Sequence, residues 1–313
     1  MSIVVNPASR PDQWMAAMAA ELPEEDLFLW PQVGASGSVE YVLAWEMAIE
    51  DLTDFPNLKA VFSLGAGVDQ WMGLAEHPEL GSVDVVRLVD PAMSDQMAAY
   101  ALHWVLHYQR GFDQVAGLKQ QRQFKPPSQT DGSDYTVGIL GHGNIGRRVS
   151  QAFIDLGYPI NAWTRSGGRG HPDPSVTHFI GSEQLDDFLA ASRAVVNVLP
   201  NTDETLGLLD RKRLAAFAPG SVFINMGRGT VVKETDLLNA LDDGPLRAAV
   251  LDVTDPEPPP SASALFEHPK VVLTGHCAGM TVVSTASRVI ADNIRRLRRG
   301  EAAFPLLDPE RGY

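Results

Sequence analysis

Tyr135-Thr136-Val137-Gly138-Ile139-Leu140-Gly141-His142-Gly143-Asn144-Ile145-Gly146 is an apolar strand that runs into a G-x-G-x-x-G sequence, and an amphipathic helix from Arg147 to Gly157 follows it. Gly141 permits the tight turn, Gly143 lets the backbone approach a pyrophosphate, and Gly146 lets the helix pack close to the sheet. The free N–H groups and the positive end of the helix dipole then face the phosphates. The stretch predicts a dinucleotide site that uses Gly141, His142, Gly143, Asn144, Ile145 and Gly146.

A second glycine-rich turn, Leu64-Gly65-Ala66-Gly67-Val68-Asp69-Gln70, also follows an apolar stretch. Gln70 stands where the third glycine would be, so this turn is a poor pyrophosphate site. It is either an ordinary strand-to-helix turn or a nest of backbone N–H groups for a small anion such as a carboxylate. The spacing alone does not favour one of these interpretations over the other.

The strand after the fingerprint indicates which dinucleotide binds. NAD-specific sites carry an acidic residue about 20 positions after the glycines, where it bonds the ribose 2′-hydroxyl. Here the strand Pro159–Trp163 is followed by Thr164-Arg165-Ser166, Arg169 comes soon after, and the next carboxylate is Asp173. A guanidinium beside hydroxyls suits a 2′-phosphate, whereas the alternative is a solvated surface arginine. The sequence therefore predicts NADPH, with NADH as a weaker cofactor.

Composition bounds the class of protein. The 313 residues are enough for two domains, and 44% hydrophobic with 20% charged residues is typical of a soluble globular protein. A net charge of −14 argues against nucleic acid or an anionic membrane as a partner. The single Cys277 excludes an internal disulfide and fits a reducing compartment. No signal peptide and no apolar run of roughly 20 residues is evident, so we expect a cytoplasmic protein.

Short apolar strands alternate with helical stretches along the chain, which is typical of parallel α/β sheets. The first half suggests strands at Ser2–Val5, Leu27–Trp30, Tyr41–Trp45, Ala60–Leu64 and Val83–Leu88, with a helix at Asp12–Glu21. A long helix from about Met93 to Arg110 and a linker at Phe124–Asp134 follow. The second half suggests strands at Tyr135–Leu140, Pro159–Trp163, Ala194–Leu199, Ser221–Met226, Ala248–Val253 and Val271–Thr274, and a closing helix from Val282 to Arg299.

Three polar side chains lie just beyond strands of the second half. Arg228 follows Ser221–Met226, and Glu257 and His276 follow the next two strands. Ligands of open parallel sheets bind beyond the carboxyl ends of the strands, so the three residues can meet in one cleft. Each alone could be structural, but their joint position favours catalysis.

Reduction of a 2-keto acid needs these three residue types. Arg228 can hold the substrate carboxylate bidentately and fix the carbonyl for hydride attack. His276 can supply the proton near neutral pH, and Glu257 beside it would raise the histidine pKa and orient the ring. His103 and His107 lie four apart on the expected helix, but no third ligand is apparent, so we expect no metal site.

These residues resemble the D-isomer-specific 2-hydroxyacid dehydrogenase family. The resemblance is carried by the segments Val137–Gly146, Leu199–Leu208, Asn225–Gly229, Asp252–Pro258 and Thr274–Gly279. Within the family the chain is most similar to the glyoxylate/hydroxypyruvate reductase A type, through Tyr41–Trp45, Val61–Asp69, Trp163–Ser166 and Arg311–Tyr313. The similarity extends over almost the full chain.

The resemblance implies a two-lobed α/β fold. A doubly wound Rossmann-type parallel sheet (residues 96–283) would bind the dinucleotide, and a smaller flavodoxin-like substrate domain would be discontinuous, at 1–95 and 284–313. Hinge closure between the lobes would exclude water. The helix near Met93–Arg110 would form much of a homodimer interface.

The resemblance also implies residue roles. Arg228 would bind substrate, Glu257 would be the partner of the histidine, and His276 would be the acid/base. The substrate carboxylate would bind Gly65, Ala66 and Gly67 through N–H groups, and Trp45 would line a small pocket. The cofactor would be bound by the glycine loop and by Thr164, Arg165, Ser166, Leu199, Pro200 and Asp252.

The chain departs from the family pattern at two positions. Gly275 replaces a common proline, which suggests a less rigid turn, and Cys277 replaces an aliphatic residue, which suggests a small buried thiol.

Two rival functions remain. One is an NAD-dependent dehydrogenase for a bulkier 2-keto acid; Trp45 and Trp71, expected near the pocket, argue against it. The other is a non-catalytic NAD(P)H-sensing binding protein. We expect an NADPH-dependent reductase of glyoxylate or hydroxypyruvate that yields the D-2-hydroxy acid.

Overall fold

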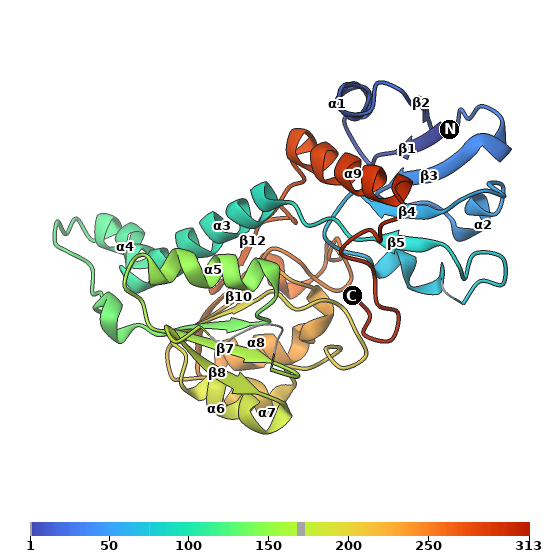
Figure 1. The fold of residues 1–313 in the computed structure, drawn as a ribbon. Helices are drawn as coiled ribbons and strands as arrows, with labels where there is room; N and C mark the ends of the chain where they lie inside the picture. The colour runs from blue at the N-terminus through green and yellow to red at the C-terminus, as the bar shows by residue number, and fades with distance from the viewer. Residues whose placement is uncertain (1, 75, 168–172) are drawn as a thin grey trace. The chain divides into compact units, whose positions relative to one another are not determined.

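The computed structural model describes residues 2–74, 76–167 and 173–313; Arg169 lies outside them. The chain divides into two compact units, one made of Met1–Met93 with Thr281–Tyr313 and the other of Ser94–Met280 (Figure 1). The family resemblance places these boundaries at 95/96 and 283/284. None of the helices in the described ranges is long and apolar enough to span a membrane.

The first unit contains, among its described residues, a five-stranded sheet in the order β2-β1-β3-β4-β5. The strands are β1 (Ser2–Asn6), β2 (Asp26–Leu29), β3 (Val39–Ala44), β4 (Ala60–Ser63) and β5 (Asp84–Val86). All of these strands pair in parallel. The order is that of flavodoxin-like sheets, as predicted, and it reverses between β1 and β3.

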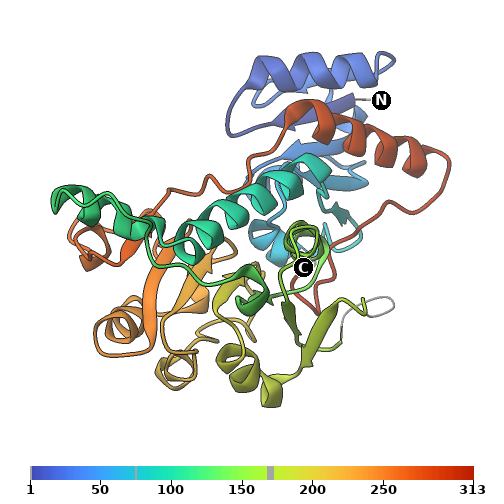
Figure 2. The same ribbon diagram turned by 90° about the vertical axis from the view of Figure 1, so that its left-hand side faces the viewer.

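Alternating side chains of this sheet fill two apolar layers, because successive residues of a strand face opposite sides. Ile3 and Val5 face the helices α1 (Pro11–Glu21) and α9 (Val283–Arg298), which lie side by side in Figures 1 and 2. Val4 faces the other layer, which is covered by α2 (Ile49–Leu52) and a 3₁₀ turn at Asp69–Leu74. Trp71 of that turn is fully buried in the layer. The Trp71 ring therefore has no exposed surface with which to line a substrate pocket.

The described part of the second unit holds a seven-stranded sheet in the order β12-β11-β10-β9-β6-β7-β8. The strands are β6 (Val137–Leu140), β7 (Ile160–Thr164), β8 (Val176–Ile180), β9 (Ala194–Asn197), β10 (Ser221–Asn225), β11 (Leu246–Leu251) and β12 (Val271–Leu273). All pair in parallel, so their carboxyl ends lie along one edge. The order reverses between β6 and β9, which confirms the predicted doubly wound sheet and puts the glycine loop at the switch point.

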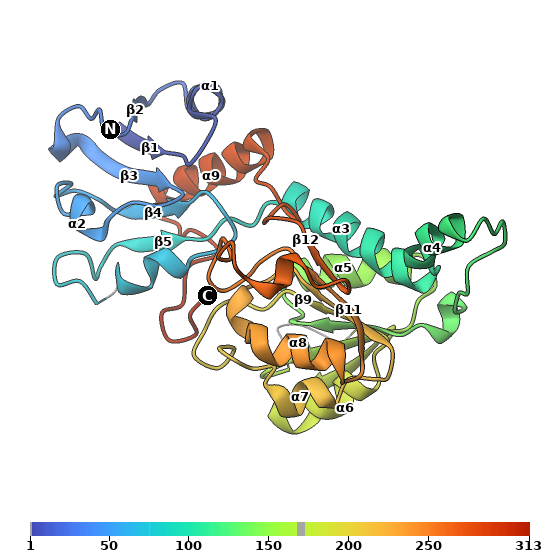
Figure 3. The same ribbon diagram turned by 180° about the vertical axis from the view of Figure 1, so that it is seen from behind.

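Helices cover both faces of this second sheet. The face covered by α6 (Leu185–Ala190), α7 (Arg211–Ala215) and α8 (Glu234–Asp242) holds a large apolar cluster (Figure 3). The other face carries α3 (Pro91–Gln109) and α5 (Asn144–Ile154), and α4 (Val115–Gln120) follows α3 along the chain (Figure 1). The helix α5 begins three residues before the predicted start at Arg147 and ends before the predicted end at Gly157. That glycine has a left-handed φ of 82°, which the helix cannot contain.

The edge strand β8 is absent from the sequence-based strands. It pairs with β7 alone, and its side chains are only partly covered, with Ile180 46% exposed. A strand at the edge of the sheet is partly exposed to solvent, so it does not need the continuous apolar run of the central strands. The sequence Val-Thr-His-Phe-Ile of β8 is therefore hard to recognise as a strand. The remaining strands were predicted to within a few residues of their ends.

Candidate active site

The glycine loop joins β6 to α5. Gly141 has a φ of 103°, a conformation that side chains disfavour. A Cβ on Gly146 would lie 2.0 Å from the carbonyl oxygen of Gly141, whereas a Cβ on Gly143 would meet nothing within 4 Å. The loop therefore folds tightly on its own backbone at Gly146 and leaves open space above Gly143. The first N–H groups of α5, from Asn144 to Gly146, sit at this helix terminus.

His142 lies in the loop but points inward. The side chain is 9% exposed, and its Nε2 lies 3.0 Å from the Ser150 hydroxyl of α5. Its ring also contacts that of His178 on β8. Burial lowers the pKa of His142 to about 4, and the nearby His178 and Arg147 add to the effect. The neutral ring supports the loop from beneath, so only its backbone can serve a ligand.

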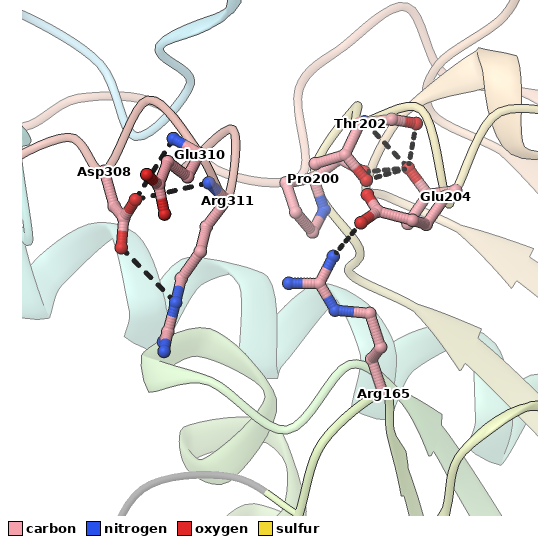
Figure 4. Close-up of polar contacts among 8 residues, drawn as sticks. Arg165, Pro200, Thr202, Glu204, Asp308, Glu310 and Arg311 are labelled. Atoms are coloured by element: carbon pink, nitrogen blue, oxygen red, sulfur yellow. Dashed lines mark hydrogen bonds and ion pairs between the residues drawn. The ribbon is translucent and has the colours of Figure 1, made fainter.

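The carboxyl ends of β7 and β9 flank the glycine loop. The backbone N–H of Leu199 and its side chain pack beside Gly141, within 3.4 Å of a Cβ built there. Thr164 ends β7, and its hydroxyl accepts a bond from the Gly167 N–H at 3.2 Å. Arg165 extends from this end to an ion pair with Glu204, with Nη1 2.6 Å from Oε1 (Figure 4). Glu204 belongs to the Pro200–Thr205 loop after β9 and was not among the predicted site residues.

Arg228, Glu257 and His276 follow three neighbouring strands, β10, β11 and β12. The carboxylate of Glu257 contacts the histidine directly, with Oε1 2.5 Å from Nδ1 of His276. Both side chains remain partly open to solvent. Because Nδ1 faces the carboxylate, Nε2 is left to face a ligand. The sequence thus identified a pair of residues 19 positions apart that the fold brings into hydrogen-bonding contact.

The turn that presents His276 is built around Asp252, which is 3% exposed. Its carboxylate accepts the N–H groups of Cys277 and Ala278 at 2.8 and 2.9 Å and the Thr274 hydroxyl at 2.6 Å. The Asp252 carbonyl accepts the His276 N–H at 2.6 Å. Asp252 is an expected cofactor residue, and here its carboxylate fixes the histidine turn.

The residues beside His276 have a left-handed backbone at Gly275 and an exposed thiol at Cys277. Gly275 has a φ of 71° and His276 a φ of 58°, both left-handed. A proline cannot adopt that φ at position 275, and the hydrogen bonds to Asp252 hold the turn in its place. These hydrogen bonds constrain the turn where no proline ring does so. Cys277 is exposed, so the expectation of a buried thiol is wrong; its side chain also interacts with Asp252 and Thr274.

Two glycines fix the backbone around Arg228. A Cβ on Gly229 would lie 2.0 Å from the carbonyl carbon of Thr254, so the Arg228 loop packs directly on the loop after β11. The side-chain amide of Asn225 donates to the Arg228 carbonyl at 3.0 Å, and the Arg228 guanidinium donates to the Gly227 carbonyl at 2.9 Å. These contacts set the position of the arginine at the end of β10.

The first unit has its own loop cluster beyond β3 and β4. The buried Ser63 hydroxyl donates to the carbonyls of Gly65 and Gly67 at 2.9 and 3.0 Å, which turns these carbonyls inward. A Cβ on Gly65 would lie 2.3 Å from the ring of Trp45, so the indole, 41% exposed, packs against this glycine. Gln70, at the place of the missing third glycine, donates to the Trp45 carbonyl at 2.6 Å. Ala66 lies between the two anchored glycines.

His103 and His107 share a face of α3, where their rings stack at 6.3 Å around Trp104. Among the described residues no group of three His, Cys, Asp or Glu side chains is arranged to hold a metal ion. Burial lowers the pKa of His107. The pair is thus part of an aromatic surface of α3.

Comparison with known proteins identifies relatives of the whole chain. The model of the D-isomer specific 2-hydroxyacid dehydrogenase NAD binding domain matches residues 99–278. Glyoxylate/hydroxypyruvate reductase A of Salmonella paratyphi B is 37% identical over 314 residues, 99% of each chain, and that of Citrobacter koseri is 39% identical over 96% of each.

Two similar solved structures carry a cofactor. A D-isomer specific 2-hydroxyacid dehydrogenase from Xanthobacter autotrophicus Py2, in complex with NADPH and MES, has a TM-score of 0.92 at 34% identity. An NADPH-dependent glyoxylate/hydroxypyruvate reductase from Sinorhizobium meliloti, in complex with NADP and sulfate, has a TM-score of 0.90 at 29% identity. Each comparison covers 100% of this chain and 99% of the other.

Proposed function

We propose that this chain, which belongs to the D-isomer specific 2-hydroxyacid dehydrogenase family, uses NADPH to reduce glyoxylate, hydroxypyruvate or a similarly small 2-keto acid to the D-2-hydroxy acid. The chain is an oxidoreductase by family. The observation that carries the proposal is the contact of His276 with Glu257 at 2.5 Å, at the sheet edge that also bears the glycine loop. A sensor of NAD(P)H would have no need of an acid/base pair there.

The residues at the switch point fit a phosphorylated dinucleotide. Gly143 has open space where a side chain would otherwise stand, and the N–H groups at the start of α5 suit a pyrophosphate. Arg165, with the hydroxyls of Thr164 and Ser166, offers a cation and donors for a 2′-phosphate at the end of β7. The bound nicotinamide supplies the hydride.

His276 acts as the general acid in this proposal. Glu257 holds Nδ1 and fixes the ring, so Nε2 can deliver a proton to the developing alkoxide. Arg228 holds the carboxylate of the substrate, and its guanidinium polarises the neighbouring carbonyl. Asp252 keeps the histidine turn rigid, so the acid does not need to be ordered when substrate binds.

The first unit contributes to substrate selection. Ser63 holds the Gly65 and Gly67 carbonyls inward, and its oxygen also accepts the Gly65 N–H at 3.4 Å. In this proposal the Gly65-Ala66-Gly67 loop binds the substrate carboxylate chiefly through the N–H groups of Ala66 and Gly67. The Trp45 indole against Gly65 limits the room beside this loop and favours a small substituent. We further propose a cytoplasmic homodimer in which the aromatic surface of α3 contributes to the interface.

Initial rates of NADPH and NADH oxidation with glyoxylate, hydroxypyruvate, pyruvate and a bulky aromatic 2-keto acid test this function. We expect the highest kcat/KM for NADPH with the two small substrates. Faster turnover of the aromatic acid with NADH would replace the proposal by the NAD-dependent rival. Tight NADPH binding without turnover of any substrate would favour the sensor.

A further inference from the structure

We propose that Glu204 determines how strongly the chain prefers NADPH over NADH, by competing with the 2′-phosphate for the guanidinium of Arg165. The inference rests on the proposed role of Arg165 as the 2′-phosphate anchor. Glu204 was not among the cofactor residues predicted from the sequence. Its proposed effect is to weaken the binding of NADPH.

The ion pair is short and is made within one unit. Arg165 Nη1 lies 2.6 Å from Glu204 Oε1, and the two side chains extend toward each other from the ends of β7 and β9 (Figure 4). The arginine is 37% exposed and the glutamate 55%, so solvent and a phosphate group can reach both. The guanidinium has five N–H donors, and Glu204 occupies donors that a 2′-phosphate would use.

The loop that carries Glu204 is fixed rather than free. The Thr205 hydroxyl donates to the Pro200 carbonyl at 2.7 Å and accepts the Thr202 N–H at 2.9 Å, which closes the turn around Glu204. The backbone N–H of Glu204 itself and the hydroxyl of Thr202 lower the pKa of the Glu204 carboxyl, and Arg165 lowers it further. The residue therefore stays charged at neutral pH, close to the guanidinium.

A fixed carboxylate affects the two cofactors differently. The 2′-phosphate carries about −1.5 to −2 charges near neutral pH, so it must displace Glu204 from Arg165 or share the arginine against repulsion. The 2′-hydroxyl of NADH is uncharged and can donate a hydrogen bond to a carboxylate. Glu204 thus lowers the affinity for NADPH but not the affinity for NADH. The ratio of the two affinities, which Arg165 raises in favour of NADPH, becomes smaller.

Glu204→Gln removes the charge and keeps the shape. We expect the Kd of NADPH, measured by nucleotide fluorescence, to fall about three- to fivefold, the factor expected for loss of one exposed ion pair and its repulsion. The Kd of NADH should stay the same or rise. The gain for NADPH should shrink as salt is raised from 20 to 500 mM, roughly the range over which the Debye length falls from about 20 Å to under 5 Å.

Asp186→Asn is the matched control, since it removes an equally charged carboxylate that pairs with Lys212 elsewhere on the same unit. It should leave the ratio of the two Kd values unchanged. In an Arg165→Ala background the effect of Glu204→Gln on NADPH should largely disappear. An equal gain there would mean that Glu204 acts as a general surface charge, which overturns the inference.

Failure of the inference and failure of the function give different results. If Glu204→Gln weakens NADPH or leaves it unchanged while Arg165→Ala still weakens NADPH selectively, only the competition is wrong. If Arg165→Ala weakens NADPH and NADH equally, the 2′-phosphate assignment itself is wrong. Glu204→Ala serves as a second variant, and it must reproduce the sign of the glutamine result.

Discussion

The buried His142 predicts that the dinucleotide unit loses stability in mild acid. The folded state resists protonation of this ring until the pH approaches its pKa of about 4, whereas the unfolded chain takes up a proton near 6.5. Between these values the unfolded state binds more protons, so the free energy of unfolding falls as the pH falls from 6.5 toward 4. The gap between 6.5 and about 4 corresponds to roughly 3 kcal/mol when the window is fully crossed.

The perturbation is His142→Gln, because the amide can replace Nε2 at the Ser150 hydroxyl without titrating in this window. At pH 7.5 the variant should be less stable than wild type, by about 1–2 kcal/mol for imperfect packing. At pH 4.5 the wild type has lost roughly 2–3 kcal/mol that the variant keeps. The difference in the free energy of unfolding between wild type and variant should therefore become smaller at pH 4.5, or change sign.

Thermal unfolding by calorimetry between pH 4.5 and 7.5 measures the effect. The difference between the midpoints of the two proteins should change by about 5–10 °C across the range, at about 2–4 °C per kcal/mol for a unit of this size. His77→Gln, at a partly exposed position of the first unit, is the control for loss of an imidazole and should parallel the wild type. Parallel curves for wild type and His142→Gln would refute a neutral buried ring.

Three further variants test the proposed site. His276→Ala should lower kcat by roughly 10²–10⁴, as usual for an acid/base group, with NADPH affinity kept; a collapse of that affinity in titrations would contradict the role. Arg165→Ala should raise the Kd of NADPH far more than that of NADH, and equal losses would remove the phosphate assignment. Gly146→Ala places a Cβ 2.0 Å from the Gly141 carbonyl oxygen, so NADPH affinity should fall at least tenfold in fluorescence titrations; wild-type binding would show that the loop can relax.

The parts of the fold that the sequence predicted share a local cause. Central parallel strands are buried on both faces, so they are continuous apolar runs, and the residues that follow them must lie along one edge of the sheet. That rule alone grouped Arg228, Glu257 and His276, and the structure brings Glu257 and His276 into contact. The edge strand β8 was not predicted, because a strand that pairs on one side only does not need a continuous apolar run.

The contacts that sequence analysis missed all depend on partners from distant segments. Glu204 gains its place from Arg165, 39 positions earlier, and only the neighbouring ends of β7 and β9 beside β6 bring the two together. His142 is buried because Ser150 and His178 lie beneath the loop. No pattern in either local segment distinguishes these residues from solvated ones.

The histidine turn shows why a local departure from a family pattern can mislead. A glycine in place of proline suggests flexibility when it is considered alone. In the structure Gly275 and His276 adopt left-handed backbone, which proline cannot, and Asp252 accepts hydrogen bonds from the residues around them. The rigidity that a proline would supply through its ring is supplied by a buried carboxylate on the preceding strand end. Loss of Asp252 should consequently affect His276 before it affects the fold, whereas restoring the proline would break the turn that the carboxylate holds.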